Sequence, residues 1–277
     1  MDGTQQIAFG NGLIFFKKAT TSNPRQNDVM FRSHSHNTVE IYCFLKGDAR
    51  FVVEGNIYTL KTGSVLLMAS GQTHNLLIDA CRVYERTVIQ IAPAALPRQF
   101  ENISGYLYGG CNFFELTRRE QDWFEESCSL IINAGEDARI NLLASFLPLL
   151  FTMLSAKLST AGGSHYEDDI VTRTIGYINK NLSSDLSLNS ISSAVYFSKA
   201  AINRKFREIM GCTVWDYVLR RRIFTARRRI FETDNITAAF EESGFGDYSS
   251  FFRAYKKIVG MSPNKDLKAY KAMKRET

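Results

Sequence analysis

An internal repeat with a period of 49 residues constrains the fold of this chain more than any other feature of its sequence. Residues 198–213 and residues 247–262 are similar when one segment is shifted onto the other. The matched pairs are Ser198 and Asp247, Ile202 and Phe251, Arg204 and Arg253, Phe206 and Tyr255, Ile209 and Ile258, Gly211 and Gly260, and Thr213 and Ser262. Self-similarity of this length indicates two copies of one supersecondary unit.

Each copy has the residue pattern of a capped helix. Ser198 and Asp247 are favoured N-cap residues, and Gly211 and Gly260 suit the left-handed position that follows a helix. Apolar residues four positions apart form one stripe against a core. The matched arginines fall off that stripe, so we expect both of them to face outward.

A shorter segment with apolar residues at helical spacing precedes each capped helix. Its apolar residues are Leu188, Ile191 and Val195 in the first copy and Ile236, Ala239 and Phe240 in the second. A helix, a tight turn and a second helix with outward polar residues are typical of a helix-turn-helix unit. Residues 213–231 join the copies as a long helix, whose six arginines are too many to bury: Arg220, Arg221, Arg222, Arg227, Arg228 and Arg229. Some of them should lie near phosphates.

Positive charge is concentrated in the part of the chain that holds the repeat. Residues 1–167 contain 14 Lys and Arg against 16 Asp and Glu, whereas residues 168–277 contain 20 against 12. The second part therefore has a net charge of +8, which favours a polyanionic partner. Charge alone leaves a solvated surface as the alternative interpretation.

The first part of the chain has the pattern of a small β-structure. Short apolar runs, separated by turn residues, lie at residues 13–18, 39–45, 49–53, 57–60, 65–69, 75–78 and 83–91. Strands this short and this regularly spaced predict a sandwich or a barrel. From about Glu115 the apolar period becomes helical, which predicts two helices that pack together. Their surplus apolar stripe either forms a dimer surface or covers the barrel.

These patterns predict an α+β protein of two domains. Residues 1–158 should form a barrel with two helices, and residues 168–277 should form an all-helical domain. The small-residue run in 159–167 is typical of a linker. A chain of 277 residues is long for one domain of roughly 100–200 residues.

The cellular location of the protein is predicted from three further features of its sequence. No uninterrupted apolar run reaches the roughly 18 residues of a membrane span; the closest, residues 140–156, contains polar residues and a proline. No basic residue precedes the first apolar run, as a signal peptide would require. The five cysteines are scattered and form no C-x-x-C pair. We therefore expect a cytoplasmic protein without a membrane segment.

Residues 175–270 resemble the DNA-binding domain of the AraC/XylS family of bacterial transcription regulators. The matching residues are Leu188, Ile191, Ser198, Ile202, Phe206, Gly211, Arg222, Ile223, Ala226, Gly244, Phe245, Asp247, Ser249, Phe251, Gly260, Ser262 and Pro263. The resemblance implies two helix-turn-helix units joined by a long helix. Ser192 and Phe240 replace a usual small Ala, and Arg229 replaces an apolar residue. Phe240 puts the tight packing of the second unit in question.

The resemblance also implies which side chains meet DNA. The base-reading positions fall on Ala200, Asn203, Arg204, Tyr248, Ser249 and Arg253. Arg can contact guanine with two hydrogen bonds, Asn can pair with adenine, and Ala offers only a methyl contact. The residues placed for phosphate are Lys199, Lys205, Arg207, Arg220, Arg221, Arg227, Arg228, Lys256 and Lys257.

Three of the four histidines lie in a pattern that resembles the two cupin motifs. The first motif holds His34, His36 and Glu40, and the second ends at His74, with Ala69 in place of the usual Pro. Imidazole and carboxylate ligands together suit Fe, Mn, Ni or Zn. Sensor domains of the regulator family share this pattern and use it as an effector pocket. A metal site of these four residues therefore remains the alternative to an effector pocket.

Other polar and aromatic side chains near the motif can line the same pocket. The expected effector-binding set is His34, His36, Glu40, Tyr42, His74 and Arg86, and further candidates are Phe15, Phe31, Tyr84 and Gln90. Strand alternation places Tyr84, Arg86, Val88 and Gln90 on one face. The sequence leaves open whether that face points inward.

Together these features predict a transcription regulator that is not an enzyme and needs no cofactor. Its expected partners are double-stranded DNA, a small-molecule effector such as a sugar, RNA polymerase and a second copy of the chain. The resemblance implies activation as the output. Two alternatives remain: a metal-dependent cupin enzyme fused to a DNA-binding domain, and a regulator that responds to no effector.

Overall fold

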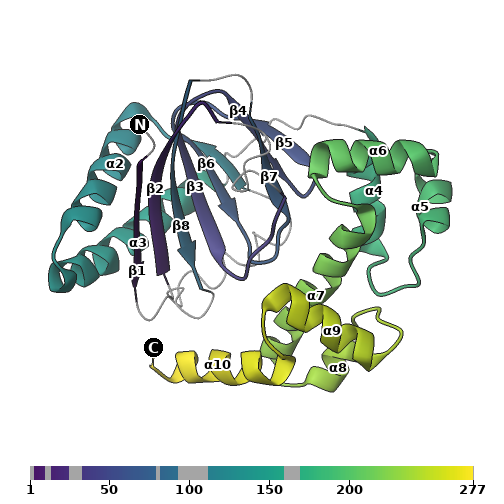
Figure 1. Ribbon diagram of the computed structural model, residues 1–277. Coiled ribbons are helices and arrows are strands. Elements are labelled where there is room, and N and C mark those ends of the chain that lie inside the picture. Colours follow the sequence, from purple (N-terminus) through teal and green to yellow (C-terminus); the bar gives the residue numbers. More distant parts are fainter. Residues whose placement is uncertain are drawn as a thin grey trace.

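A β-rich part is followed along the chain by a helical part (Figure 1). The computed structural model describes residues 3–9, 14–24, 33–78, 82–92, 112–158 and 169–276. Its strands are β1 (Gly3–Phe9), β2 (Ile14–Ser22), β3 (Val39–Lys46), β4 (Ala49–Val53), β5 (Asn56–Thr59), β6 (Ser64–Met68), β7 (His74–Ile78), β8 (Val83–Ile91) and β9 (Asn112–Glu115). The predicted linker 159–167 and Phe31 lie outside the described residues.

The described strands form two antiparallel sheets that enclose a common interior. One sheet has the order β1-β2-β8-β3-β6-β9, and the other has the order β5-β4-β7. Aromatic and aliphatic side chains from both sheets fill the space between them, including Tyr42, Phe51, Leu66 and Tyr84. This is the cupin-like barrel that the strand spacing and the histidine motifs predict.

Strand register settles which face of β8 points inward. Tyr42 lies opposite Val88, and Glu40 lies opposite Gln90, so these side chains share one face of the large sheet. Ile89 and Ile91 alternate to the other face, where they join the core beneath the helices. Tyr84, Arg86, Val88 and Gln90 therefore face the barrel interior.

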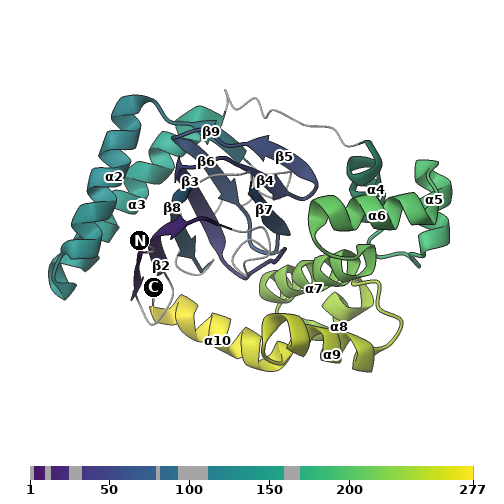
Figure 2. The same cartoon turned by 45° about the horizontal axis from the view of Figure 1, so that its top comes forward.

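Two helices cover the outer face of the large sheet (Figure 2). They are α2 (Arg118–Asn133) and α3 (Glu136–Leu158). Thr117 and Glu120 form a capping box at the start of α2. By length and composition, Glu136–Lys157 is apolar enough to cross a membrane. Its fully buried Leu150, Phe151 and Leu154 belong to the core with the sheet, as expected for the core helix of a folded domain.

The helical part contains the two predicted repeat units. Its helices are α4 (Asp169–Lys180), α5 (Leu188–Val195), α6 (Lys199–Met210), α7 (Val214–Thr233), α8 (Ile236–Glu241), α9 (Tyr248–Val259) and α10 (Pro263–Glu276). Ser198 and Asp247 cap α6 and α9 through hydrogen bonds from the amides of Ala201 and Ser250. Gly211 and Gly260 end these helices with φ values of 65° and 87°, where a side chain would be strained.

One of the six arginines of the long helix α7, Arg222, is buried. Arg222 is only 6% exposed, and it donates hydrogen bonds to the carbonyl oxygens of Leu182 and Ser184 at 2.9 and 2.7 Å. These two carbonyls lie in the segment between α4 and α5. Arg222 therefore fixes that segment to α7.

Candidate DNA-binding surface and effector cavity

Two helix pairs, α5–α6 and α8–α9, have the geometry of helix-turn-helix units. In the first, Tyr196 ends α5 in the left-handed conformation, with φ 62°. The hydroxyl of Ser192, which stands where the family has Ala, donates to the carbonyl of Phe197 at 2.6 Å and closes the turn. In the second, Gly244 has φ 78°, and an added Cβ would lie 2.6 Å from the carbonyl oxygen of Leu182. Only glycine fits there.

The large Phe240 of α8 packs within the second unit instead of separating its helices. Its ring lies 5.4 Å from the ring of Tyr248 and 5.7 Å from the ring of Phe251, as measured between centroids. Aromatic rings at such distances attract each other in tilted and edge-to-face arrangements. The second unit is therefore closed by aromatic contacts where the family pattern has a small residue.

The predicted base-reading residues lie on the N-terminal halves and middles of α6 and α9. Ala200, Arg204, Tyr248, Ser249 and Arg253 are exposed, and Asn203 is half-buried. The buried stripes of the two helices face the protein core through Phe206 and Tyr255. Both helices therefore present these polar side chains to the outside.

The predicted phosphate-contacting residues fall into three groups. Lys199, Arg207, Lys256 and Lys257 are exposed. Two others form ion pairs within their own helices, namely Lys205 with Glu208 at 3.3 Å and Arg228 with Glu232 at 3.7 Å. The side chains of the remaining three, Arg220, Arg221 and Arg227, contact other residues of the protein, as described below.

Arg227 holds the helical part together and is not available for phosphate. Its guanidinium donates two hydrogen bonds to the carboxylate of Asp266, at 2.6 and 3.0 Å, and it lies over the ring of Phe231. Asp266 is buried and also accepts a hydrogen bond from the hydroxyl of Tyr255 at 2.7 Å. The prediction that Arg227 contacts DNA is therefore corrected: it joins α7 to α10.

Arg220 and Arg221 point toward the barrel. Arg220 donates to the hydroxyl of Ser35 at 3.3 Å, and Arg221 lies 3.8 Å from the carboxylate of Glu54. The same carboxylate accepts a hydrogen bond from the hydroxyl of Tyr217 and another, at 2.6 Å, from the amide of Thr73. Glu54 thus ties the β4–β5 turn and the segment before β7 to α7.

Two further contacts join the barrel to the helices. Gly71 has φ 83° and donates its amide to the carbonyl of His36 at 2.8 Å. An added Cβ there would lie 2.5 Å from the ring of Phe224 in α7. Val52 and Ile57 of the small sheet belong to one buried cluster with residues of α4 to α7.

A cavity of about 400 Å³ opens into the barrel interior. It is lined by Phe15, Lys17, His34, Glu40, Tyr42, Phe51, His74, Asn75, Leu76, Tyr84, Arg86, Val88 and Gln90. Five of the six predicted effector-binding residues are in this lining, and the sixth, His36, is outside it but contacts Glu40. Lys17, Phe51, Asn75 and Leu76 were missed. Of these, Lys17 lies two residues from Phe15 on one strand, which is the alternation signal that points to it.

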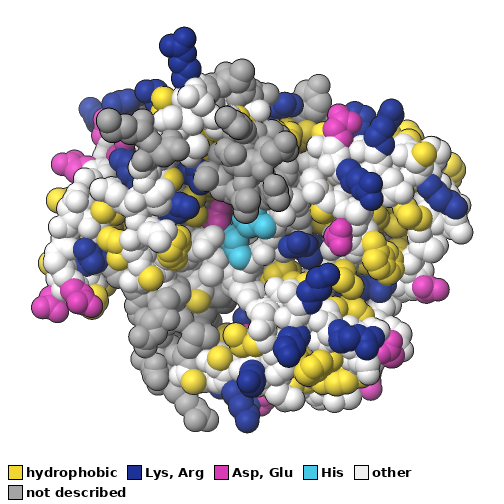
Figure 3. Space-filling model, in the orientation of Figure 1, with side chains coloured by type: hydrophobic (Ala, Val, Ile, Leu, Met, Phe, Trp, Pro, Cys, Tyr) yellow, Lys and Arg dark blue, Asp and Glu magenta, His cyan; other side chains and the backbone are white. Residues whose placement is uncertain are grey.

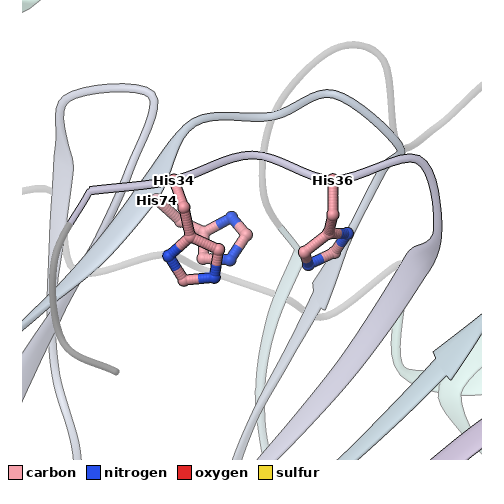
Figure 4. A group of neighbouring side chains, drawn as sticks. All are labelled: His34, His36 and His74. Carbon is pink, nitrogen blue, oxygen red and sulfur yellow. The ribbon is translucent and has the colours of Figure 1, made fainter. Parts of the chain in front are cut away.

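The three motif histidines lie close together (Figure 4), and two of them, His34 and His74, line the cavity. One nitrogen from each of His34, His36 and His74 lies within 4.8 Å of the other two. Figure 3 shows histidine side chains in a recess at the surface, beside Lys and Arg side chains of the helical part. Glu40 contacts the cluster from β3, with one carboxylate oxygen 2.7 Å from Nε2 of His36 and the other 4.0 Å from Nε2 of His74.

Hydrogen bonds fix the proton positions in the cluster. His74 Nδ1 lies 3.0 Å from the carbonyl of Gln72, so Nδ1 carries the proton. Its Nε2 is buried without a hydrogen-bond partner among the described residues. His36 donates from Nε2 to Glu40 and accepts at Nδ1 from the hydroxyl of Thr38.

The charge states follow from burial and from these contacts. Burial lowers the pKa of His74 to about 3, against the attraction of Glu40. Burial by itself would raise the pKa of Glu40, but the His36 hydrogen bond and the positive potential of His74 and His36 hold it at about 2. At neutral pH the cavity therefore contains a carboxylate and a neutral imidazole whose Nε2 lone pair is unused.

Comparisons with known proteins match two separate segments of the chain. Residues 20–150 match the AraC-like ligand binding domain, and residues 191–269 match a helix-turn-helix domain. The HTH-type transcriptional activator RhaS of Pectobacterium carotovorum is 25% identical over 90% of this chain and 93% of its own length.

Two further similarities cover most of the chain. The arabinose operon regulatory protein of Escherichia coli is 24% identical over 79% of this chain and 77% of its own length. A solved structure of ToxT from Vibrio cholerae, 13% identical, aligns over 96% of this chain and 97% of its own, with a TM-score of 0.40.

Proposed function

The chain belongs to the AraC family of DNA-binding transcription regulators, and on that premise we propose that it activates transcription under the control of a small molecule bound in the barrel cavity. The observation that carries this proposal is the pair of capped helices α6 and α9, which present polar side chains outward from a part of the chain with a net charge of +8. Each helix would enter a major groove, and the two grooves would lie about 10 base pairs apart on one face of DNA.

The proposal also includes the regulatory output and the binding partners of the protein. The RhaS relative is named an activator, and the second relative is named for the arabinose operon. We extend activation through RNA polymerase to this chain. We also propose that the protein is located in the cytoplasm. A sugar or a chemically related compound is the proposed effector class. A homodimer would bury the apolar residues that α2 and α3 expose, namely Leu130, Ile140 and Leu149, which are 58%, 59% and 54% exposed.

We propose that the contacts between the barrel and the helices couple effector binding to DNA binding. Asn75, His34 and His74 line the cavity, and the same region holds α6 and α7 through Asn75, Ser35 and Glu54. An effector that binds one arrangement of the two parts more tightly than another would shift the population between them. The free energy available for this shift equals the difference in effector affinity for the two arrangements.

The experiment that tests the function is selection of bound sequences from a random DNA library by the full-length protein. We expect enrichment of two short motifs about one helical turn apart, and a binding constant that falls steeply with salt concentration. Absence of any enriched motif, or an affinity that is independent of salt, contradicts the proposal. Binding of RNA polymerase to a promoter carrying the selected site then tests activation.

A metal centre is the second candidate function, and the histidine cluster is the observation that favours it. His34, His36, His74 and Glu40 would hold a divalent ion, because the unpartnered Nε2 of His74 and the ionised Glu40 are ready ligands. His36 must give up its Nε2 proton to join them. Elemental analysis of tag-free protein, alongside His34→Ala and His74→Ala, separates the two candidates: stoichiometric metal that both variants lose supports the metal centre and revives the enzyme alternative.

A further inference from the structure

We propose that the DNA site of this regulator contains a thymine in the half bound by α9, and that the ring of Tyr248 recognises this base by packing against its 5-methyl group. This inference rests on the proposed function, since it names the base chemistry that the second helix-turn-helix unit selects. It also gives Phe240, which does not itself contact the base, the role of a positioning residue for Tyr248.

The helices α6 and α9 differ in chemistry at two corresponding positions of the repeat. The shift of 49 residues superposes Tyr248 on Lys199. The same shift superposes Phe252 on Asn203. The first helix therefore has an ammonium group and an amide where the second has two aromatic rings. An amide can pair with adenine through hydrogen bonds, whereas an aromatic ring offers apolar contact, and thymine is the base that presents a methyl group in the major groove.

Tyr248 occupies a place in α9 from which a side chain can reach base edges. It is the first residue of the helix, directly after the N-cap Asp247. In helix-turn-helix units the N-terminal residues of the second helix contact base edges. Tyr248 is 43% exposed in the protein without DNA. Contact with a methyl group would remove part of this apolar surface from water, which is favourable.

Phe252 extends the apolar surface of Tyr248 by one helical turn. The two residues are four positions apart, so they lie on the same side of α9, and their ring centroids are 6.3 Å apart. Arg253, Lys256 and Lys257 are exposed on the same helix. An apolar patch beside several cations fits the edge of a base that is flanked by phosphates, because the cations can contact the phosphates while the rings contact the base.

The ring of Tyr248 is held in place by two other aromatic rings. Its centroid lies 5.4 Å from that of Phe240, in an edge-to-face arrangement, and 5.8 Å from that of Phe251. Phe251 is fully buried, so it provides a fixed support. A side chain that is already ordered loses little conformational freedom on binding. Phe240, which stands where the family has a small Ala, therefore supplies a contact that prepares Tyr248 for the base.

The first experiment removes the methyl group alone. The full-length protein is titrated with the DNA site obtained by selection and with copies in which one thymine at a time is replaced by uracil, which lacks only the 5-methyl group. We expect at least one replacement to weaken binding by about two- to fivefold, the effect of one lost methyl contact. At that position 5-methylcytosine should bind better than cytosine. Selected motifs without thymine, or thymines that all tolerate uracil, overturn the proposal.

Variants of Tyr248 assign the methyl contact. In Tyr248→Ser, DNA with thymine and DNA with uracil at the sensitive position should bind equally, whereas Tyr248→Phe should keep the wild-type ratio. Lys199→Ala, at the corresponding position of the repeat, is the matched control: it should weaken both DNAs by the same factor. Each ratio compares two DNAs with one protein, so a difference in the folded fraction cancels. A full uracil effect that persists in Tyr248→Ser overturns the assignment.

The positioning role of Phe240 is tested with the same ratio. Phe240→Ala should reduce the preference for thymine over uracil at the position sensed by Tyr248. Phe240→Leu keeps most of the apolar volume and is the second variant, in case the first one unfolds. A wild-type ratio in both variants, or in Phe240→Leu where Phe240→Ala does not fold, overturns the positioning role. A selection that enriches no motif removes the proposed function, whereas enriched motifs without a thymine that depends on Tyr248 overturn this inference alone.

Discussion

The side chain of Asn75 donates a hydrogen bond from Nδ2 to the backbone carbonyl of Ile209, over an N–O distance of 3.2 Å. Asn75 lines the barrel cavity, and Ile209 lies in the last turn of α6, the first candidate recognition helix. One residue therefore contacts both the space for an effector and a helix that would contact DNA. No intermediate element is needed between them.

Asn75→Ala should remove this direct connection. We expect the variant, compared with wild type at saturating ligand, to lose most of the ligand-dependent change in DNA affinity, because the Ile209 contact is gone. The measurement is DNA binding with and without a ligand of the cavity, at ligand concentrations that saturate both proteins. Thr59→Ala, an exposed position on β5, is the control. A ligand response of normal size in Asn75→Ala would place the coupling elsewhere.

Glu54→Gln should loosen the contact between the barrel and α7. Its carboxylate accepts from Thr73 and Tyr217 and lies near Arg221, and hydrogen bonds to a charged group contribute about 1.5–3 kcal/mol each. We expect the free energy of unfolding to fall by about 1–3 kcal/mol in urea denaturation. Glu136→Gln, at the start of α3, is the comparison. Equal stability of the two variants would show that Glu54 contributes nothing to this contact.

Arg204→Ala should affect specific and non-specific DNA binding differently. If Arg204 reads a guanine, its loss costs about 1–3 kcal/mol on the selected site and relaxes the preference at one base pair. Lys257→Ala removes an exposed charge on α9, so it should weaken selected and random DNA alike. Titration of both variants against both DNAs distinguishes the two roles. Proportional losses for Arg204→Ala would assign it to phosphate.

Arg227→Ala should destabilise the helical part of the protein. We expect its effect on the free energy of unfolding to be larger than its effect on DNA affinity. The substitution leaves the buried carboxylate of Asp266 without its guanidinium partner, and breaking such a pair costs about 3–5 kcal/mol. Arg228→Ala removes only a partly exposed pair with Glu232 and should change stability by less than about 1 kcal/mol. Chemical denaturation measures both. An unchanged stability of Arg227→Ala would restore the phosphate role.

Acid should destabilise the barrel through His74. Its folded-state pKa of about 3 is below the ordinary value of 6.5, so the unfolded chain binds a proton that the folded chain does not. This contribution to stability is complete above pH 6.5 and decreases as the pH falls toward 3, by about 1.4 kcal/mol per pH unit once the unfolded histidine is protonated. His74→Gln, measured in the presence of a chelator between pH 7 and pH 5, should show a shallower loss than wild type. Parallel curves would mean that His74 is protonated in the folded protein.

Local signals predicted most of the fold. The N-caps Ser198 and Asp247 and the terminal glycines of α6 and α9 are decided by their immediate neighbours, so the repeat located them directly. The seven predicted strands each match an observed strand, because alternation and turn residues are also local. Strands β1 and β9 were missed, and the residues of β1 have little apolar alternation.

Local sequence signals could not predict contacts between residues that are far apart in the sequence. Arg227 meets Asp266 across 39 residues, and Tyr217 meets Glu54 across 163 residues. A run of arginines on a helix is compatible with DNA, solvent or a buried acid, and only the packing of α7 decides among them. The cavity lining was predicted better, because the cupin spacing and the alternation of β8 fix which side chains share a face.

At Gly71 the absence of a Cβ atom allows the barrel to pack against α7. Its backbone holds the loop of His36, and the space for a side chain is taken by Phe224 of α7. Any larger residue would push the barrel and α7 apart without touching the cavity lining or the DNA-facing helices. A genetic selection for regulators that have lost their dependence on an inducer should therefore return substitutions at Gly71, which neither lines the cavity nor belongs to α6 or α9.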